Sequence, residues 1–156
     1  MPSAATDADD AHAAYLYRPE ARRDLGRKCL QCVRPTDAVK LWFLWRAWGR
    51  EGMAARVESL FRLRDELVAG IEAAPNLSLA LPPAYLNVCF RVDPQRDVGD
   101  RDDFHRRLAI RLAEEGRAVV SEAPFRGQIV LRPAVVNPRF DPEAFLCHVQ
   151  ETAAAL

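Results

Sequence analysis

Four cysteines are the first residues in this sequence whose types and spacing suggest chemistry. Cys29 and Cys32 form a CxxC pair, a spacing found in metal and redox sites. A zinc site would need a second pair of ligands. Cys89 falls in an expected strand, and Cys147 falls in an expected helix with His148 beside it rather than one turn away. We therefore expect no metal site.

Redox chemistry at the CxxC pair is also disfavoured. A thioredoxin-like pair opens a helix directly after a strand, whereas Pro35 and Thr36 place the next helix start beyond Cys32. Free, partly buried cysteines in a reducing cytosol fit better. The acidic, alanine-rich start of the chain does not resemble a signal peptide, and no uncharged stretch reaches transmembrane length. These observations predict a cytoplasmic protein with no membrane partner.

The basic side chains are almost all arginines. Only Lys28 and Lys40 are lysines, so few amines are available for a Schiff base. Arginine suits a different task, because its planar and permanently charged guanidinium can bind a carboxylate through two hydrogen bonds. Arg132 is the main candidate, since it lies in an expected strand between Leu131 and Pro133. Strand alternation by itself favours a solvent-facing arginine there.

The overall composition is that of a soluble globular chain with one core. The sequence has 156 residues, of which 49% are apolar and 28% are charged. Lysine plus arginine and aspartate plus glutamate both number 22, so the formal net charge is zero. This balance argues against broad electrostatic binding of nucleic acid or anionic membranes.

The N-terminal part is expected to contain a helix that this chain cannot enclose. Residues 1–12 are small and acidic, which predicts a disordered arm. Residues 13–50 combine a charged loop with a helix capped by Thr36 or Asp37. Through Trp48 this helix is apolar on nearly every side. Such a helix must be enclosed, so we expect a second chain to cover it.

A connecting helix is expected over residues 51–74. Its apolar residues recur at spacings of three and four, which indicates one buried stripe. Gly49 and Gly52 predict a break before the helix, and Pro75 predicts its end.

The remaining residues, 75–156, predict a compact α+β unit. The order strand, strand, helix, strand, strand, helix gives a sheet with helices on one face. Asp141 is a natural N-cap for the last helix, and Gly116 suits the end of the helix expected over residues 100–115. The expected elements cover residues 77–81, 86–92, 100–115, 118–120, 128–136 and a last helix from 141.

Several short motifs occur in an order that is specific to one family. They are Tyr15-Leu16-Tyr17; Asp24-Leu25-Gly26 with Leu30-Gln31-Cys32; Arg34, Asp37, Lys40-Leu41-Trp42, Trp45, Gly49 and Gly52; Asn87-Val88-Cys89-Phe90-Arg91; and Leu131-Arg132 with Asn137-Pro138. Together they resemble the C-terminal third of the group II pyridoxal-phosphate-dependent amino-acid decarboxylases. This family includes the glutamate, cysteine-sulfinate, diaminobutyrate and aromatic amino-acid decarboxylases. The match covers nearly everything after residue 13.

The resemblance implies both a fold and a division of labour. Residues 75–156 would be the C-terminal small domain of the type I, aspartate-aminotransferase-like fold, preceded by two helices from the end of the large domain. In the family, the Schiff-base lysine lies just before the segment that Tyr15-Leu16-Tyr17 resembles, and Lys28 and Lys40 match other positions. We therefore expect this chain to be inactive alone, with pyridoxal 5'-phosphate bound mainly by a partner chain.

The resemblance also assigns candidate site residues. Arg132 matches the family's arginine for the substrate carboxylate. Gln31, Cys32, Val33 and Arg34 match an interface loop that approaches the cofactor. For Arg34, an ion pair at the start of the following helix is an equal alternative. No catalytic residue is expected in this chain.

Two departures from the family pattern bear on activity. Val33 replaces the usual glycine, which puts a β-branched side chain where the backbone was free. The interval from Arg18 to Lys28 lacks the tyrosine that serves the family as a proton donor.

These features leave three hypotheses about function. The first is a split decarboxylase, in which a lysine-bearing N-terminal subunit pairs with this chain in a dimer of heterodimers that acts on an amino acid. The second is a non-catalytic regulatory or binding module that docks on a decarboxylase-like partner. The third is a truncated remnant, against which the regular caps and apolar patterns through Leu156 argue.

Overall fold

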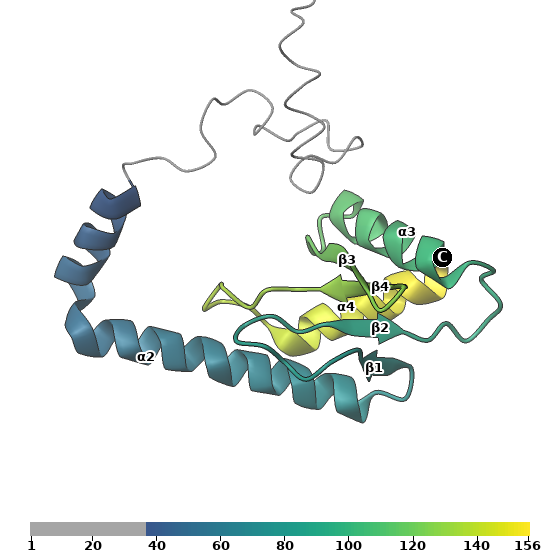
Figure 1. Ribbon diagram of the computed structural model, residues 1–156, viewed down its shortest axis with the longest axis horizontal. Helices are drawn as coiled ribbons and strands as arrows, with labels where there is room; N and C mark the ends of the chain where they lie inside the picture. Colours follow the sequence, from purple (N-terminus) through teal and green to yellow (C-terminus); the bar gives the residue numbers. More distant parts are fainter. Residues whose placement is uncertain (1–36) are drawn as a thin grey trace, which may run out of the picture. The chain divides into compact units, whose positions relative to one another are not determined.

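The computed structural model describes residues 37–156 (Figure 1). The chain divides into two units, residues 1–49 and 50–156, and each is described by itself. The arm, the CxxC pair and the predicted interface loop, with Gln31, Cys32, Val33 and Arg34, lie outside the described residues.

Helix α2 (Asp37–Ala73) contains one residue with a non-helical backbone. This residue is Gly49, with φ 64° and ψ −171°, a conformation that is available essentially to glycine alone. The predicted break is therefore at Gly49, whereas Gly52 is helical and takes no part in it. The helix ends before Pro75, as predicted. Within residues 37–156, no helix combines the length and apolarity that a membrane span requires.

Residues 37–48 of α2 form an apolar segment whose side chains are exposed. Trp42 and Phe43 contact each other edge to face, with ring centroids 5.0 Å apart, and the guanidinium of Arg46 lies 5.9 Å from the Trp42 ring. The buried residues of α2, Leu67 and Ile71, are both in its other part. Cover of the segment by another chain stays a prediction. The exposed large apolar residues of the segment are Val39, Leu41, Trp42, Phe43, Leu44, Trp45 and Trp48.

Four antiparallel strands form one sheet in the order β1-β2-β4-β3 (Figure 1). The strands are β1 (Leu77–Leu79), β2 (Phe90–Val92), β3 (Ser121–Phe125) and β4 (Gln128–Arg132). β1, β2 and β4 are shorter than predicted. Pairing between β2 and β4 is limited to Phe90↔Leu131, with a separate bridge at Asn87↔Ala134.

The prediction of a strand at residues 118–120 is wrong. Val119 is 91% exposed, and β3 begins only at residue 121. The reason is the two-residue hairpin turn of Arg126 and Gly127, whose φ values of 50° and 77° suit a tight β-turn. This turn pairs β3 with β4 residue by residue and places Pro124 opposite Ile129.

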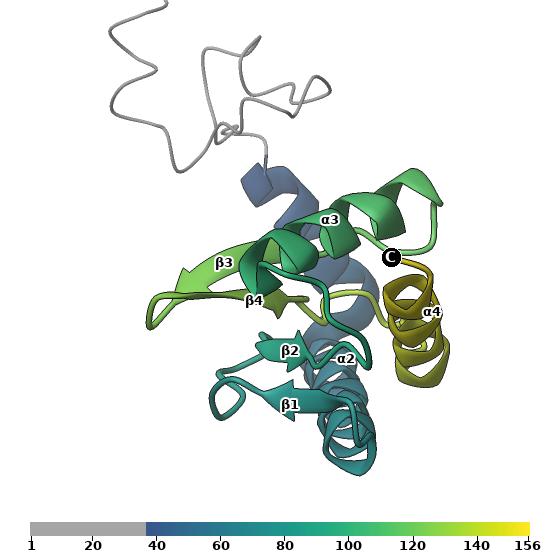
Figure 2. The ribbon, with the colours of Figure 1, turned by 90° about the vertical axis from the view of Figure 1, so that its right-hand side faces the viewer.

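Two further helices, α3 (Arg101–Glu114) and α4 (Pro142–Ala155), complete the α+β unit (Figure 2). The predicted cap at Asp141 is confirmed, because its carboxylate accepts from the Ala144 N–H. The structure also places Asp100 as the N-cap of α3 rather than within the helix, and its carboxylate accepts from the N–H groups of Asp102 and Asp103. The helices and one face of the sheet enclose a single core, which confirms the predicted fold class. Its fully buried members include Leu67, Ile71, Val88, Phe90, Phe104, Leu108, Leu112, Leu131 and Val149.

Candidate functional site

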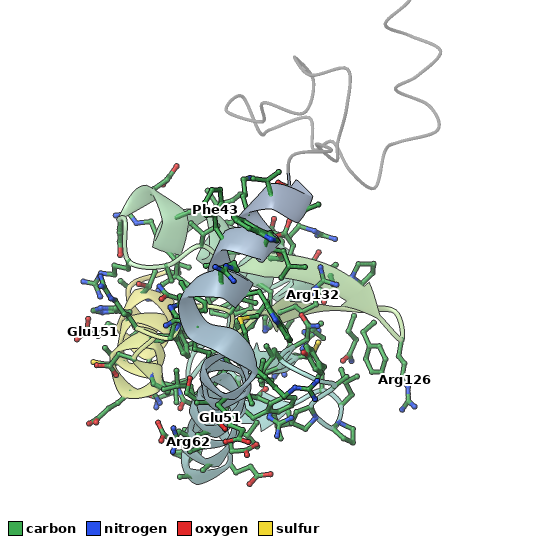
Figure 3. The ribbon with its side chains drawn as sticks, turned by 90° about the vertical axis from the view of Figure 1, so that its left-hand side faces the viewer. Phe43, Glu51, Arg62, Arg126, Arg132 and Glu151 are labelled. Atoms are coloured by element: carbon green, nitrogen blue, oxygen red, sulfur yellow. The ribbon has the colours of Figure 1, made fainter. Side chains whose placement is uncertain are left out.

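Arg132, the predicted carboxylate-binding residue, is the exposed last residue of β4 (Figure 3). Side chains alternate along a strand, so Arg132 lies on the sheet face opposite the buried Leu131. Among residues 37–156, no carboxylate forms an ion pair with Arg132. The guanidinium is therefore available for a carboxylate from outside the described residues.

Cys89 is the neighbour of Arg132 on this face. The pairing of Phe90 with Leu131 puts Cys89 across from Arg132, with both side chains on the same side of the sheet. Burial raises the pKa of the Cys89 thiol, and the positive charge of Arg132 only partly offsets this. The thiol therefore stays protonated near neutral pH and does not compensate the charge of Arg132.

A second arginine on the same face, Arg91, is already neutralised. Its Nη1 donates to Asp102 Oδ1 at 3.1 Å and to the Ile129 carbonyl at 2.7 Å. Asp102 Oδ1 also accepts from the Ile129 N–H at 2.8 Å. The hydrogen bond from Ile129, with a smaller contribution from Arg91, lowers the pKa of Asp102 and keeps this carboxylate ionised. Of the two arginines, Arg132 is the one free to bind a ligand.

His105 was predicted only as a surface or core filler, and it lies fully buried in the core. Its Nε2 accepts from the Val92 N–H at 3.0 Å, and its Nδ1–H donates to the Arg101 carbonyl. Burial lowers the pKa of His105, so the ring is neutral at pH 7. Sequence reasoning missed its contact with Val92 and that of Asp102 with Ile129, because both join residues of α3 to strands through the fold.

A surface cluster joins the end of α3 to α4 without the features of a reactive site. Arg117 binds the Glu151 carboxylate and lowers its pKa. Cys147 Sγ donates to the other oxygen of Glu151 at 3.4 Å, and this bond raises the pKa of the thiol. Cys147 is therefore a protonated thiol in a structural ion-pair network.

The described residues do not fit the attachment of an aldehyde cofactor. Lys40 is the only lysine among residues 37–156, and its Nζ is paired with Asp37 Oδ1 at 2.7 Å on the exposed surface. No group of three or more histidine, cysteine, aspartate or glutamate residues in this range could hold a metal ion. What these residues offer is an unpaired arginine on a sheet face, suited to binding a carboxylate.

This chain is similar in sequence to pyridoxal-dependent decarboxylases. The family model described as pyridoxal-dependent decarboxylase conserved domain matches residues 3–93. The acidic amino acid decarboxylase GADL1 of Mus musculus is 31% identical over 147 residues, which cover 85% of this chain and 27% of the relative. The cysteine sulfinic acid decarboxylase of Homo sapiens is 30% identical over 127 residues, which cover 73% of this chain and 26% of the relative. This chain thus spans little more than a quarter of the length of either relative.

Two solved structures that this chain resembles are also decarboxylases. Mouse CSAD superposes with a TM-score of 0.70 and 26% identity, over 85% of this chain and 31% of that chain. The tryptophan decarboxylase of Catharanthus roseus, in complex with L-tryptophan, has a TM-score of 0.66 and covers 85% of this chain and 29% of that chain. Its identity is 18%, so it supports the fold alone.

Proposed function

Because this chain belongs to the pyridoxal-dependent decarboxylases, a family that uses pyridoxal phosphate, we propose that it is the small subunit of a split L-amino-acid decarboxylase. A lysine-bearing partner polypeptide supplies the remainder of the enzyme and holds the cofactor. Pyridoxal phosphate supplies the electron sink for loss of the carboxylate. The contribution of this chain is the C-terminal unit with Arg132, which binds the substrate carboxylate.

The observation that carries this proposal is the contrast between the two arginines on the sheet face. Asp102 neutralises Arg91, whereas Arg132 has no carboxylate partner among residues 37–156 and lies beside the protonated thiol of Cys89. A guanidinium in this state can bind a carboxylate bidentately without first breaking an ion pair. The substrate carboxylate fits this description.

The exposed apolar segment, residues 37–48, supports the existence of the partner. Obligate interfaces are large and apolar, and aromatic residues are enriched at their centres. Trp42, Phe43 and Trp45 are all exposed within this one short stretch of helix. In the proposed assembly they are buried against the lysine-bearing subunit, and two such heterodimers form the complete enzyme.

Co-expression tests the proposal directly. The chain would be produced with a candidate lysine-bearing subunit, and the purified complex assayed for bound cofactor by its visible absorbance and for carbon dioxide release from a panel of acidic and aromatic amino acids. We expect a stable complex with turnover, and no turnover from either chain alone. A wild-type complex that binds cofactor but releases no carbon dioxide would overturn the catalytic role.

Arg132→Ala isolates the role of the arginine within that complex. Each charge-assisted hydrogen bond contributes about 1.5–3 kcal/mol, so loss of two predicts a fall in kcat/KM of about a hundredfold or more. Arg126→Ala is the matched control, because Arg126 is an arginine at the tip of the same hairpin whose guanidinium lies 5.2 Å from the Phe125 ring. Equal effects of the two substitutions would contradict the role of Arg132.

The alternative function is a non-catalytic module that docks on a decarboxylase-like partner. Val33 and the absence of a tyrosine between residues 18 and 28 favour it, since both depart from the family pattern. In that case the partner would have the same turnover with and without this chain, and Arg132→Ala would change neither complex formation nor turnover.

A further inference from the structure

The ladder between the two central strands of the sheet stops after one pair. β2 and β4 pair at Phe90↔Leu131, so an unbroken antiparallel ladder would next place Val92 opposite Ile129 in a hydrogen-bonded pair. The hairpin that joins β3 and β4 directs the N–H and C=O of Ile129 away from β3 and toward β2. These two residues nevertheless do not bond to each other.

Side chains take the place of the missing ladder bonds. The Val92 N–H donates to His105 Nε2, and the Ile129 N–H donates to Asp102 Oδ1. The Ile129 carbonyl accepts from Arg91 Nη1, which also reaches Asp102. We call Arg91, Asp102 and His105 the polar plug, because they satisfy the backbone groups at the point where β2 and β4 separate.

We propose that Asp102, acting with Arg91, is a positioning residue for Arg132: the polar plug fixes β4 relative to β2 and α3, and so sets where the Arg132 guanidinium lies. This inference rests on the proposed function, in which Arg132 binds the substrate carboxylate. Asp102 and Arg91 do not touch the substrate. They act through the backbone of Ile129, three residues before Arg132 on the same strand.

Few backbone hydrogen bonds join β4 to β2. Within the strands themselves there is one ladder pair. The other backbone hydrogen bonds between these two stretches of chain lie beyond Arg132: the Val88 N–H donates to the Pro133 carbonyl, and the Val135 N–H donates to the Leu86 carbonyl. Before Arg132 on β4, the connections to β2 are the single pair Phe90↔Leu131 and the plug. Asp102 also joins α3 to β4 by a hydrogen bond, because its Oδ1 accepts from the Ile129 N–H as well as from Arg91.

The experiment compares two alanine variants from the same helical turn, in the full-length chain bound to its partner subunit. Asp102→Ala removes the contact with β4. Asp103→Ala is the control, because Asp103 is likewise an acid in the first turn of α3 but pairs only with the neighbouring Arg107 on the surface, at 2.8 Å. Both variants lose the same favourable interaction with the helix N-terminus.

For Asp102→Ala we expect KM for the amino acid to rise about tenfold or more, with kcat within about threefold of wild type, since small displacements of a binding group cost one to two orders of magnitude. For Asp103→Ala both constants should stay within about twofold. Arg91→Met should share the Asp102 effect, since it removes both hydrogen bonds that Arg91 Nη1 donates, to Asp102 and to the Ile129 carbonyl. Equal KM changes in the two alanine variants would overturn the inference.

A second measurement keeps this inference separate from the proposed function. In the full-length chain without its partner, amide hydrogen exchange of Ile129 and the side-chain Nε–H resonance of Arg132 report on β4 directly. Asp102→Ala should accelerate exchange at Ile129 about tenfold or more and shift the Arg132 resonance, and Asp103→Ala should do neither. If the wild-type complex shows no turnover, the proposed function fails while these readings still decide the positioning role. Unchanged exchange and an unshifted resonance in Asp102→Ala would overturn it.

Discussion

The two parts of α2 have the same helical backbone but opposite surroundings. Residues 50–73 place Leu67 and Ile71 in the core, where both are fully buried, whereas residues 37–48 bury no large side chain. Helical conformation follows from local sequence, but a short isolated helix is marginal in water and is usually stabilised by packing. The comparison shows that one part of the helix is stabilised within this chain, and we infer that the other depends on a partner.

The largest expected difference between the two parts comes from two phenylalanine substitutions. Phe104→Ala removes a fully buried ring from the core and should lower the free energy of unfolding by about 3–5 kcal/mol. Phe43→Ala, at a side chain that is 62% exposed in the apolar segment, should change it by less than about 0.5 kcal/mol. Urea unfolding of the chain without partner measures both. A cost above about 1 kcal/mol for Phe43→Ala would mean that this chain packs the segment itself.

Binding of the partner should depend on the apolar segment rather than on the packed part of the chain. Trp45→Ala should weaken the complex about thirtyfold, because a central aromatic residue contributes about 2 kcal/mol or more to an interface. Ile110→Ala is the control, since Ile110 is 53% exposed, close to the 49% of Trp45, but lies on α3. Titration calorimetry or biolayer interferometry with the lysine-bearing subunit would measure the difference. Similar losses from both substitutions would show that the segment is not the contact surface.

The packed part should also respond to acid through His105. Burial lowers the pKa of His105 in the folded state, so below the ordinary value of about 6.5 the unfolded chain binds more protons. The free energy of unfolding should therefore fall as the pH drops below about 6.5. The charged groups that act on the ring are Arg91, Asp102 and Asp93, and the Arg101 carbonyl accepts from it.

His105→Leu tests this dependence. The substitution leaves the Val92 N–H without its acceptor and should cost about 1–3 kcal/mol at pH 7. It should also flatten the pH dependence of the urea midpoint between pH 7 and 5. A His105→Leu profile as steep as wild type would contradict the assignment.

The smallest effect is expected where the two parts of α2 meet. Gly49→Ala places a side chain at φ 64°, and the strain should cost about 1 kcal/mol or slightly more, although nothing lies within 4 Å of the new Cβ. Gly52→Ala, at a helical position, should instead stabilise the chain by about 0.5–1 kcal/mol. Opposite signs in thermal unfolding would confirm that the break lies at Gly49. Stabilisation by both substitutions would show that an uninterrupted helix is preferred.

Sequence predicts the parts of this fold that depend on neighbouring residues. Asp141 caps its helix because a short acidic side chain before an apolar period suits the unpaired N–H groups of a first turn. The apolar residues 118–120 predict a strand that ends just before β3 in fact begins, at residue 121. The usable signal was the Arg126-Gly127 turn, which sets the pairing of both flanking strands.

The site is predicted only in part, for a physical reason. The motif around Arg132 predicts its role, and within residues 37–156 it has no carboxylate partner on the sheet face. Asp102 and His105 look in sequence like ordinary residues of a charged helix. Their partners, Ile129 and Val92, lie on two different strands, and only the folded chain brings them within hydrogen-bonding distance.

Pro124 in the edge strand β3 has a consequence for how this chain can assemble. An exposed strand edge invites a strand from another molecule, which would extend the sheet or seed aggregation. Pro124 lies opposite Ile129, whose backbone groups point away from β3, so the proline nitrogen faces the free edge and offers no N–H there. The free edge of β3 thus lacks one N–H donor and is a poorer template for a further strand at this position.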